Sequence, residues 1–208
     1  MNIWPNITSA NDIPGWTTDV QHELYKDVAN LLPQVPNVLE IGCGWGRSTW
    51  AWLNVLPSDT KFFILDTFGL TNEYLFFASK LIDNKEEFYQ YARYVEKENI
   101  QHRDIFDKII QQHPKFYLIE KIWQENTIDW FGGKDVITDW DLVYYDGDHD
   151  YQAVKDMLRL FEHVPVVCGD DYAPDFQGTI DAITEYANEK TCSVEILPGR
   201  FWMIKNEV

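Results

Sequence analysis

Short apolar segments alternate along the chain with longer segments in which apolar residues recur every three or four positions. The short segments predict buried strands and the longer ones predict helices with one apolar stripe. The expected strands are residues 37–42, 61–66, 115–120, 141–146, 164–168, 193–197 and 201–204. The expected helices are residues 17–32, 48–56, 151–162 and 177–189, with two or three more between 71 and 113, the last of them over 103–112.

This alternation predicts an α/β fold with a mainly parallel sheet. Only a turn around Pro198 and Gly199 separates the last two strands, so we expect them to pair as an antiparallel hairpin. The length of 208 residues is that of one domain, and we expect a single domain over residues 1–208. Within it, residues 1–36 form an N-terminal helical segment and residues 70–113 a helical insertion. The aromatic side of that insertion could be a substrate cap or a surface for homo-oligomer formation.

Charge and cysteine content narrow the classes of function. The chain has 34 acidic and 17 basic side chains, a net charge of −17. Phosphate groups require clustered basic side chains, so we expect no nucleic-acid partner and no anionic membrane partner. Three widely spaced cysteines fit neither a disulfide framework nor a zinc site, and are typical of a reducing compartment. We find no signal-peptide pattern and no long apolar run, and expect a cytoplasmic protein that acts on a small molecule.

A glycine cluster, Glu40-Ile-Gly-Cys-Gly-Trp-Gly46, follows the first expected strand. Glycines at this place let the chain turn sharply and let a ligand approach the backbone, at the usual crevice of a doubly wound sheet. The G-x-G-x-G spacing differs from the G-x-G-x-x-G of dinucleotide enzymes. A tight turn with close strand–helix packing would explain the cluster without any ligand.

Asp66 ends the second expected strand, where a carboxylate can accept two hydrogen bonds from ribose hydroxyls. The glycine cluster and this acid together predict a nucleoside ligand, either NAD or S-adenosylmethionine. Taken alone, Asp66 could equally be a helix or turn cap.

The segment Val38 to Gly46 resembles the first motif of class I S-adenosylmethionine-dependent methyltransferases. This resemblance implies a Rossmann-like, seven-stranded sheet of order 3-2-1-4-5-7-6. It also implies cofactor contacts from the glycine loop and its neighbours, a ribose contact from the acid after the second strand, and adenine contacts from the loop after the third. The cofactor-binding residues expected on this basis are Glu40, Gly42, Cys43, Gly44, Trp45, Gly46, Asp66, Thr67, Trp123 and Gln124.

Carboxylates also follow the fourth and fifth expected strands, in Asp146-Gly-Asp-His-Asp-Tyr151 and Gly169-Asp-Asp-Tyr172. Adjacent strand ends are close enough for such side chains to share one ion, and oxygen ligands favour Mg²⁺ or another hard divalent cation. Asp170 and Asp171 can both be ligands only if the strand has ended before them, because successive strand residues face opposite ways. The alternatives are that Asp146 caps a helix and that Asp170 and Asp171 are solvated turn residues.

These two segments are similar to the methyltransferase branch that includes macrocin O-methyltransferase and cephalosporin hydroxylase-like proteins. The similarity covers roughly residues 37–68 and 141–190 and is absent from 70–140. In metal-dependent members of this branch, the acid after the fourth strand and the acid pair after the fifth bind Mg²⁺. By motif position these ligands are Asp146, Asp170 and Asp171.

Methyl transfer to a hydroxyl group needs a base as well as a cofactor, and Asp146 and His149 are the candidates. Histidine ionises nearest to neutral pH, although His149 could instead be a helix-start residue paired with Asp148. The other four histidines are expected at the surface, and Trp45 is the tryptophan expected to touch a ligand.

We therefore expect an S-adenosylmethionine-dependent O-methyltransferase that modifies a small hydroxylated acceptor with the help of a divalent metal. The alternatives are an NAD(P)-dependent oxidoreductase of Rossmann type and a methyltransferase-fold binding protein without turnover.

Overall fold

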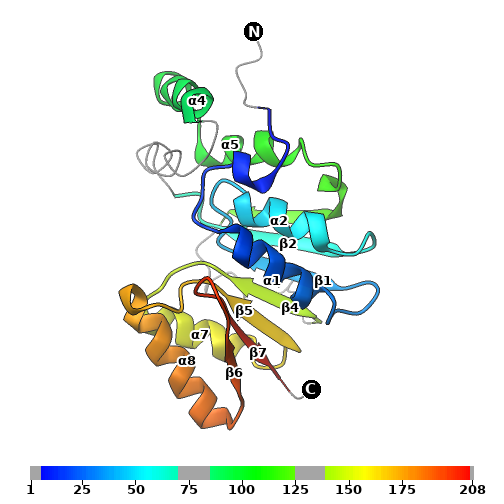
Figure 1. Cartoon of the computed structure of the whole chain (residues 1–208), viewed down its shortest axis with the longest axis vertical. Coiled ribbons are helices and arrows are strands. Elements are labelled where there is room, and N and C mark those ends of the chain that lie inside the picture. Colours follow the sequence, from blue (N-terminus) through cyan, green and yellow to red (C-terminus); the bar gives the residue numbers. More distant parts are fainter. Residues whose placement is uncertain (1–5, 70–84, 125–138, 207–208) are drawn as a thin grey trace. The chain divides into compact units, whose positions relative to one another are not determined.

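The computed structural model describes residues 6–69, 85–124 and 139–206 (Figure 1). The strands are β1 (Asn37–Ile41), β2 (Lys61–Asp66), β3 (Ile119–Gln124), β4 (Leu142–Tyr145), β5 (Val166–Gly169), β6 (Val194–Ile196) and β7 (Trp202–Lys205). The α-helices are α1 (Asp19–Ala29), α2 (Arg47–Val55), α4 (Lys85–Glu98), α5 (His102–Ile110), α7 (Tyr151–Leu160) and α8 (Gln177–Lys190). Short 3-10 turns cover Ala10–Asp12, Phe116–Leu118 and Pro174–Phe176.

The strands form one seven-stranded sheet of order β3-β2-β1-β4-β5-β7-β6. The first five strands of this order pair in parallel, while β7 pairs antiparallel with β5 and with β6. The predicted fold class, strand order and C-terminal hairpin are therefore confirmed.

The third strand is displaced from its predicted place. Residues 115–120 were expected to be a strand because of the run Phe116-Tyr-Leu118, but these three residues form a 3-10 turn and β3 begins only at Ile119. β3 is an edge strand of the sheet, and its residues are largely exposed. A half-exposed edge strand carries polar residues such as Glu120 and Lys121, so the search for a continuous apolar run missed it.

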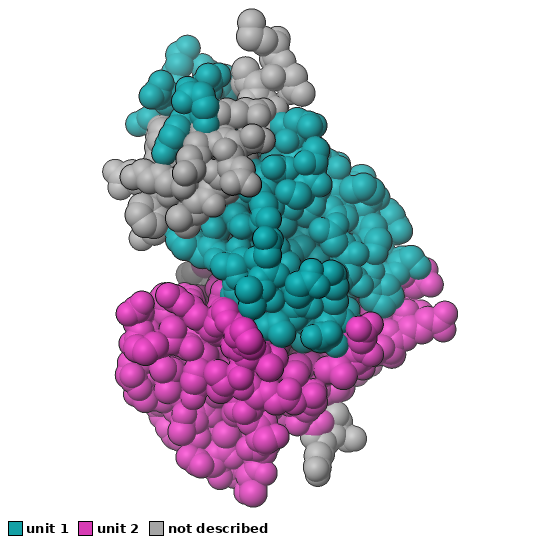
Figure 2. All heavy atoms as spheres, in the orientation of Figure 1, with its two compact units in different colours: residues 1–29, 43–58, 68–118 teal, residues 30–42, 59–67, 119–208 magenta. Residues whose placement is uncertain are grey.

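The chain divides into two compact units, coloured in Figure 2. Unit 1 comprises residues 1–29, 43–58 and 68–118, and unit 2 comprises residues 30–42, 59–67 and 119–208. The sheet, α7 and α8 belong to unit 2, whereas α1, α2, α4 and α5 belong to unit 1. Residues 70–84, the first part of the predicted insertion, lie outside the described residues.

In unit 2, α7 and α8 pack side by side against one face of the sheet (Figure 1). Val154, Met157 and Leu158 of α7 and Ile183 of α8 share a buried apolar cluster with side chains of β1, β4 and β5. Burying a large aliphatic side chain contributes about 1.5–3 kcal/mol, so this cluster holds the strand ends of β4 and β5 in place.

In unit 1, α1 packs on α2 through stacked rings of Tyr25 and Trp52, whose centroids lie 4.1 Å apart. The stripe of α5 that is buried includes Ile105, Phe106 and Ile109. His102 and His113, expected at the surface, are instead buried, with 6% and 3% exposure. No helix in the described part of the chain is both long enough and apolar enough to cross a membrane.

Candidate functional site

The carboxyl ends of β1, β2, β4 and β5 meet at one edge of the sheet in unit 2. The sheet hydrogen bonds continue past the strands, because the amides of Gly42, Asp146 and Asp170 donate to the carbonyls of Leu65, Ile41 and Tyr145, over 2.9, 2.8 and 3.2 Å. This continuation places Gly42, Asp146 and Asp170, each of which follows directly on its strand, at the same level of the sheet.

Gly42 is required by this packing. A Cβ atom at Gly42 would lie 2.0 Å from the carbonyl oxygen of Asp146, and the residue has a φ of +84°. The close approach of the β1 and β4 ends therefore explains this glycine before any ligand is considered. Gly46 shows a similar effect in unit 1, since its Cβ would lie 3.2 Å from the Phe106 ring.

The residues expected to hold a nucleoside form two groups, one at the end of β2 and one at the end of β3. Asp66 is 8% exposed and lies opposite Gln124, the last residue of β3, while Thr67 is exposed just beyond β2. Trp123 was predicted to lie in the loop after the third strand, and this is wrong. It lies within β3, 7% exposed, with its ring stacked on Phe63 at 5.6 Å.

Glu40 lies one residue before the end of β1 and is fully buried. Its neighbours across the sheet are Ile64 on β2 and Tyr144 on β4. A carboxylate at such a position cannot reach bulk water, so it is part of the electrostatic environment of the strand ends.

The remainder of the glycine cluster forms a tight turn in unit 1. The amide of Gly46 donates to the carbonyl of Cys43 over 2.8 Å, and Gly44 and Gly46 have φ of +51° and +97°. Gly46 is also the residue that precedes α2, so the turn leads directly into that helix. Trp45 is 2% exposed, and Trp16 and His102 lie against its ring at 6.3 and 5.5 Å. Its enclosed ring differs from the ligand-facing tryptophan that we expected.

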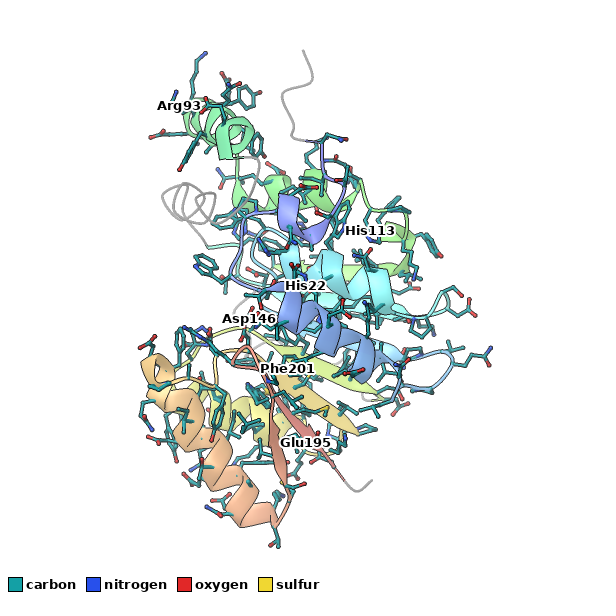
Figure 3. The ribbon with its side chains drawn as sticks, in the orientation of Figure 1. His22, Arg93, His113, Asp146, Glu195 and Phe201 are labelled. Atoms are coloured by element: carbon teal, nitrogen blue, oxygen red, sulfur yellow. The ribbon has the colours of Figure 1, made fainter. Side chains whose placement is uncertain are left out.

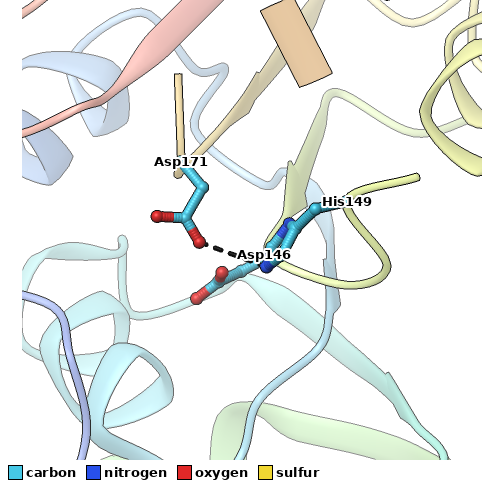
Figure 4. A group of neighbouring side chains, drawn as sticks. All are labelled: Asp146, His149 and Asp171. Atoms are coloured by element: carbon cyan, nitrogen blue, oxygen red, sulfur yellow. Dashed lines mark ion pairs between the residues drawn. The ribbon is translucent and has the colours of Figure 1, made fainter. Parts of the chain in front are cut away.

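Three side chains from the loops after β4 and β5 converge in unit 2 (Figure 4). Asp146, His149 and Asp171 offer ligand atoms that all lie within 4.8 Å of one another. Nε2 of His149 is 3.1 Å from a carboxylate oxygen of Asp171. The partner of His149 is therefore Asp171, on the neighbouring loop, and not the adjacent Asp148 that the sequence offered as an alternative.

The chain bends sharply between the two acids after β5. Asp170 is 7% exposed, and one of its carboxylate oxygens accepts a hydrogen bond from the Asp171 amide over 2.6 Å. Asp171 has a φ of +64°, in the left-handed region that few residues other than glycine adopt. This bend directs Asp171 toward His149. The convergent group, which consists of Asp146, His149 and Asp171, therefore contains His149 in the place for which the sequence had predicted Asp170.

Like charges dominate the electrostatics of this edge. Burial, followed by the charges of Asp170, Asp171, Glu40 and Asp66, raises the pKa of Asp146 well above its ordinary value (Asp146 is labelled in Figure 3). Burial also raises the pKa of Asp171, although His149 and Arg200 oppose that effect. Acids with raised pKa values are typical of sites that bind a cation or exchange protons.

Arg200 and Phe176 complete the surroundings of His149. The guanidinium of Arg200, from the turn between β6 and β7, is 3.5 Å from the second carboxylate oxygen of Asp171. The Phe176 ring meets the His149 ring edge-on, with centroids 4.5 Å apart. The ring of His149 is thus held by a carboxylate and an aromatic ring, which fixes its orientation.

No protein-family model matches this sequence, and no curated protein is similar to it at a significant level. Solved structures do match. They include a presumed O-methyltransferase from Klebsiella pneumoniae (TM-score 0.61, 13% identity, 95% of this chain and 85% of that chain) and an O-methyltransferase from Bacillus cereus in complex with S-adenosylhomocysteine (0.59, 13%, 95% and 86%). A third is the O-methyltransferase TomG from Streptomyces achromogenes, which is involved in tomaymycin synthesis and was solved in complex with S-adenosylmethionine (0.57, 12%, 94% and 84%). The chain therefore has the fold of class I methyltransferases.

Proposed function

We propose that this protein is an S-adenosylmethionine-dependent O-methyltransferase of the macrocin O-methyltransferase and cephalosporin hydroxylase-like branch, acting on a small hydroxylated acceptor. The observation that carries the proposal is the edge of the sheet. A glycine turn after β1, an acid at the end of β2 and a His–carboxylate group after β4 and β5 occur together in this fold. Structures of similar fold contain S-adenosylmethionine or S-adenosylhomocysteine, which favours this cofactor over NAD.

For the cofactor, we assign the amino-acid end to the glycine cluster and the ribose to Asp66. The turn that contains Gly42, Gly44 and Gly46 has positive φ values and leads into the N-terminus of α2, and a helix N-terminus suits a charged amino-acid group. Gln124 and Thr67 lie next to Asp66 in the sheet and in the chain, and are assigned to the nucleoside. Trp123 is assigned to the core. When bound, S-adenosylmethionine supplies a methyl group on a sulfonium leaving group.

For proton removal, we assign His149 as the base and Asp171 as the residue that orients it. In neutral His149, Nε2–H donates to the Asp171 carboxylate, which leaves the Nδ1 lone pair to accept a proton from the acceptor hydroxyl. The carboxylate also stabilises the imidazolium that forms. Asp146 is a second acceptor of protons at the same place, because its pKa is raised above the ordinary value of a carboxyl group.

The convergent group also fits a divalent cation. Two carboxylates and an imidazole within 4.8 Å of one another are common ligands of Mn²⁺ and Fe²⁺ and, through the oxygens, of Mg²⁺. Asp146 and Asp171 would hold the cation, whereas Asp170, which accepts a hydrogen bond from the Asp171 amide, lies outside the convergent group. A cation there would lower the energy of the deprotonated acceptor as a Lewis acid.

Calorimetry with S-adenosylhomocysteine tests the cofactor assignment. We expect heat of binding for the wild type and a loss of affinity of roughly tenfold or more for Asp66→Asn, because a carboxylate-to-hydroxyl hydrogen bond is charge-assisted. Asp59→Asn is the matched control, since it removes an exposed acid before the other end of β2. Absence of heat with the wild type, or heat with NADH in its place, would overturn the proposal.

Transfer of a labelled methyl group to a panel of phenols, sugars and hydroxy acids tests turnover. A methylated product whose formation stops in EDTA and recovers with Mg²⁺ or Mn²⁺ supports the metal. Product formation that EDTA leaves unchanged supports His149 and Asp171 acting alone and rejects the metal. Cofactor binding without any product would support a binding protein that lacks turnover.

A further inference from the structure

His102 contacts the glycine turn from within unit 1. It is the first residue of α5, is 6% exposed, and its Nε2 lies 2.8 Å from the carbonyl oxygen of Gly44. A carbonyl oxygen can only accept, so Nε2 of His102 must carry the hydrogen and donate it. This hydrogen bond joins residues 58 positions apart in the chain.

Two further contacts hold α5 against the same turn. The ring of His102 lies 5.5 Å from that of Trp45 and 5.2 Å from that of Phe68. One helical turn further along α5, the Phe106 ring lies 3.2 Å from the position that a Cβ of Gly46 would take. The turn is therefore supported at Gly44, Trp45 and Gly46 by one helix.

The hydrogen bond acts on the peptide that connects Gly44 to Trp45. Because a trans peptide is planar, its carbonyl and its N–H point in opposite directions. Gly44, with a φ of +51°, has no side chain to limit the rotation of this peptide. Fixing the Gly44 carbonyl toward His102 consequently fixes the direction in which the Trp45 amide points away from it.

We propose that His102 is a positioning residue for the cofactor: its hydrogen bond to Gly44 holds the Gly44–Trp45 peptide in the orientation that binds S-adenosylmethionine. This inference rests on the proposed function, since it assumes that the glycine turn binds this cofactor. His102 itself need not touch the ligand, because it acts through the backbone of the turn.

His113 provides a matched control from the same unit. It is also buried, at 3% exposure, its Nε2 lies 3.0 Å from the side-chain oxygen of Asn54, and its ring meets Trp50 edge-on at 4.6 Å. The two histidines thus share burial, an aromatic neighbour and one Nε2 contact. They differ in that His113 contacts a side chain of α2, whereas His102 contacts the glycine turn.

The experiment compares His102→Leu, His102→Gln and His113→Leu by calorimetry with S-adenosylhomocysteine and by thermal unfolding without ligand. Leucine removes the donor, whereas the glutamine amide can place an N–H close to that of Nε2. We expect His102→Leu to weaken binding roughly tenfold, the usual effect of one lost hydrogen bond, and His102→Gln to recover most of it. His113→Leu should lower the melting temperature and leave the affinity of the folded protein unchanged.

Three results would overturn the inference. One is equal affinity in the wild type and in His102→Leu, and another is equal loss in His102→Leu and His102→Gln, which would indicate packing only. The third is a parallel loss of affinity in His113→Leu, which would indicate general destabilisation. If the wild type itself gives no heat, the proposed function fails and this inference fails with it. Heat with the wild type together with any of the three results above overturns this inference alone.

Discussion

Two charged regions of unit 2 differ in how their charges are balanced. The first is the acidic edge, which consists of Glu40, Asp66, Asp146, Asp170 and Asp171 at the strand ends. The second is the helix ladder, a set of ion pairs that join α7 and the turn after it to α8. Its pairs are Lys155–Glu185 at 2.5 Å, Lys190–Glu162 at 2.6 Å and Arg159–Glu189 at 3.5 Å.

The pKa values of the carboxyl groups move in opposite directions in the two regions. In the helix ladder, hydrogen bonds from Lys155 and Tyr151 lower the pKa of Glu185 to about 2, and Lys190 lowers that of Glu162. In the acidic edge, burial and neighbouring acids raise the pKa of Asp146 and burial raises that of Asp171. Charge density alone therefore does not locate a functional site. A group of carboxylates that raise one another's pKa values is the better indicator.

The largest expected effect is on catalysis at the acidic edge. His149→Gln and Asp171→Asn should each reduce the rate of methyl transfer by roughly 10²-fold or more, because each change removes the oriented base. The measurement is kcat with the acceptor found by the panel, alongside the S-adenosylhomocysteine affinity, which should be retained. Asp175→Asn is the control, since its carboxylate is 80% exposed and lies 3.9 Å from the guanidinium of Arg200. An equal loss in Asp175→Asn would show that overall charge, and not the base, is responsible.

An intermediate effect is expected on stability at Asp146. Asp146→Asn should raise the free energy of unfolding at neutral pH while it reduces methyl transfer, because it removes one of several repelling charges. The raised pKa of Asp146 means that its folded form retains a proton more readily than its unfolded form. The gain should therefore shrink as the pH falls and wild-type Asp146 takes up its proton.

Urea unfolding at several pH values measures this gain. Asp148→Asn removes an exposed acid two residues away and should give no comparable increase. A loss of stability in Asp146→Asn at neutral pH would contradict the account of an acidic edge under electrostatic strain.

The smallest effect is expected in the helix ladder. Glu185→Gln should slightly lower the melting temperature at neutral pH and leave methyl transfer unchanged, since Glu185 pairs with Lys155 on a neighbouring helix. The folded-state pKa of about 2 is below the ordinary 4.5, so this stabilisation is present above pH 4.5. It is lost as the pH falls from 4.5 to about 2.

Thermal unfolding of Glu185→Gln and wild type across that range checks the prediction. Glu189→Gln, in the longer ion pair with Arg159, should have a still smaller effect. A changed rate of methyl transfer in Glu185→Gln would contradict the prediction that only the acidic edge, and not the helix ladder, affects activity.

Much of the fold could be predicted from local patterns. The strand 61–66 was predicted with its observed bounds, and helices α2, α7 and α8 to within two residues at each end. The error at β3 arose because an edge strand is only half-buried, so its residues need not form a continuous apolar run. The spacing of apolar residues along α5 also indicated which of its other side chains are buried, and the sequence prediction did not use this pattern. His102 lies on the same stripe as Ile105, Phe106 and Ile109, which is the stripe that is buried.

Apolar runs, glycines and strand-end acids were thus enough to predict the α/β class, and with the resemblance they indicated the strand order and the edge of the sheet at which the candidate site lies. These features depend on neighbours in the chain, and backbone sterics and periodicity make them readable there. The partner of His149, the enclosure of Trp45 and the hydrogen bond from His102 to Gly44 were decided by the tertiary structure alone. They depend on distances of a few ångströms between segments far apart in the chain, which packing sets and no local pattern encodes.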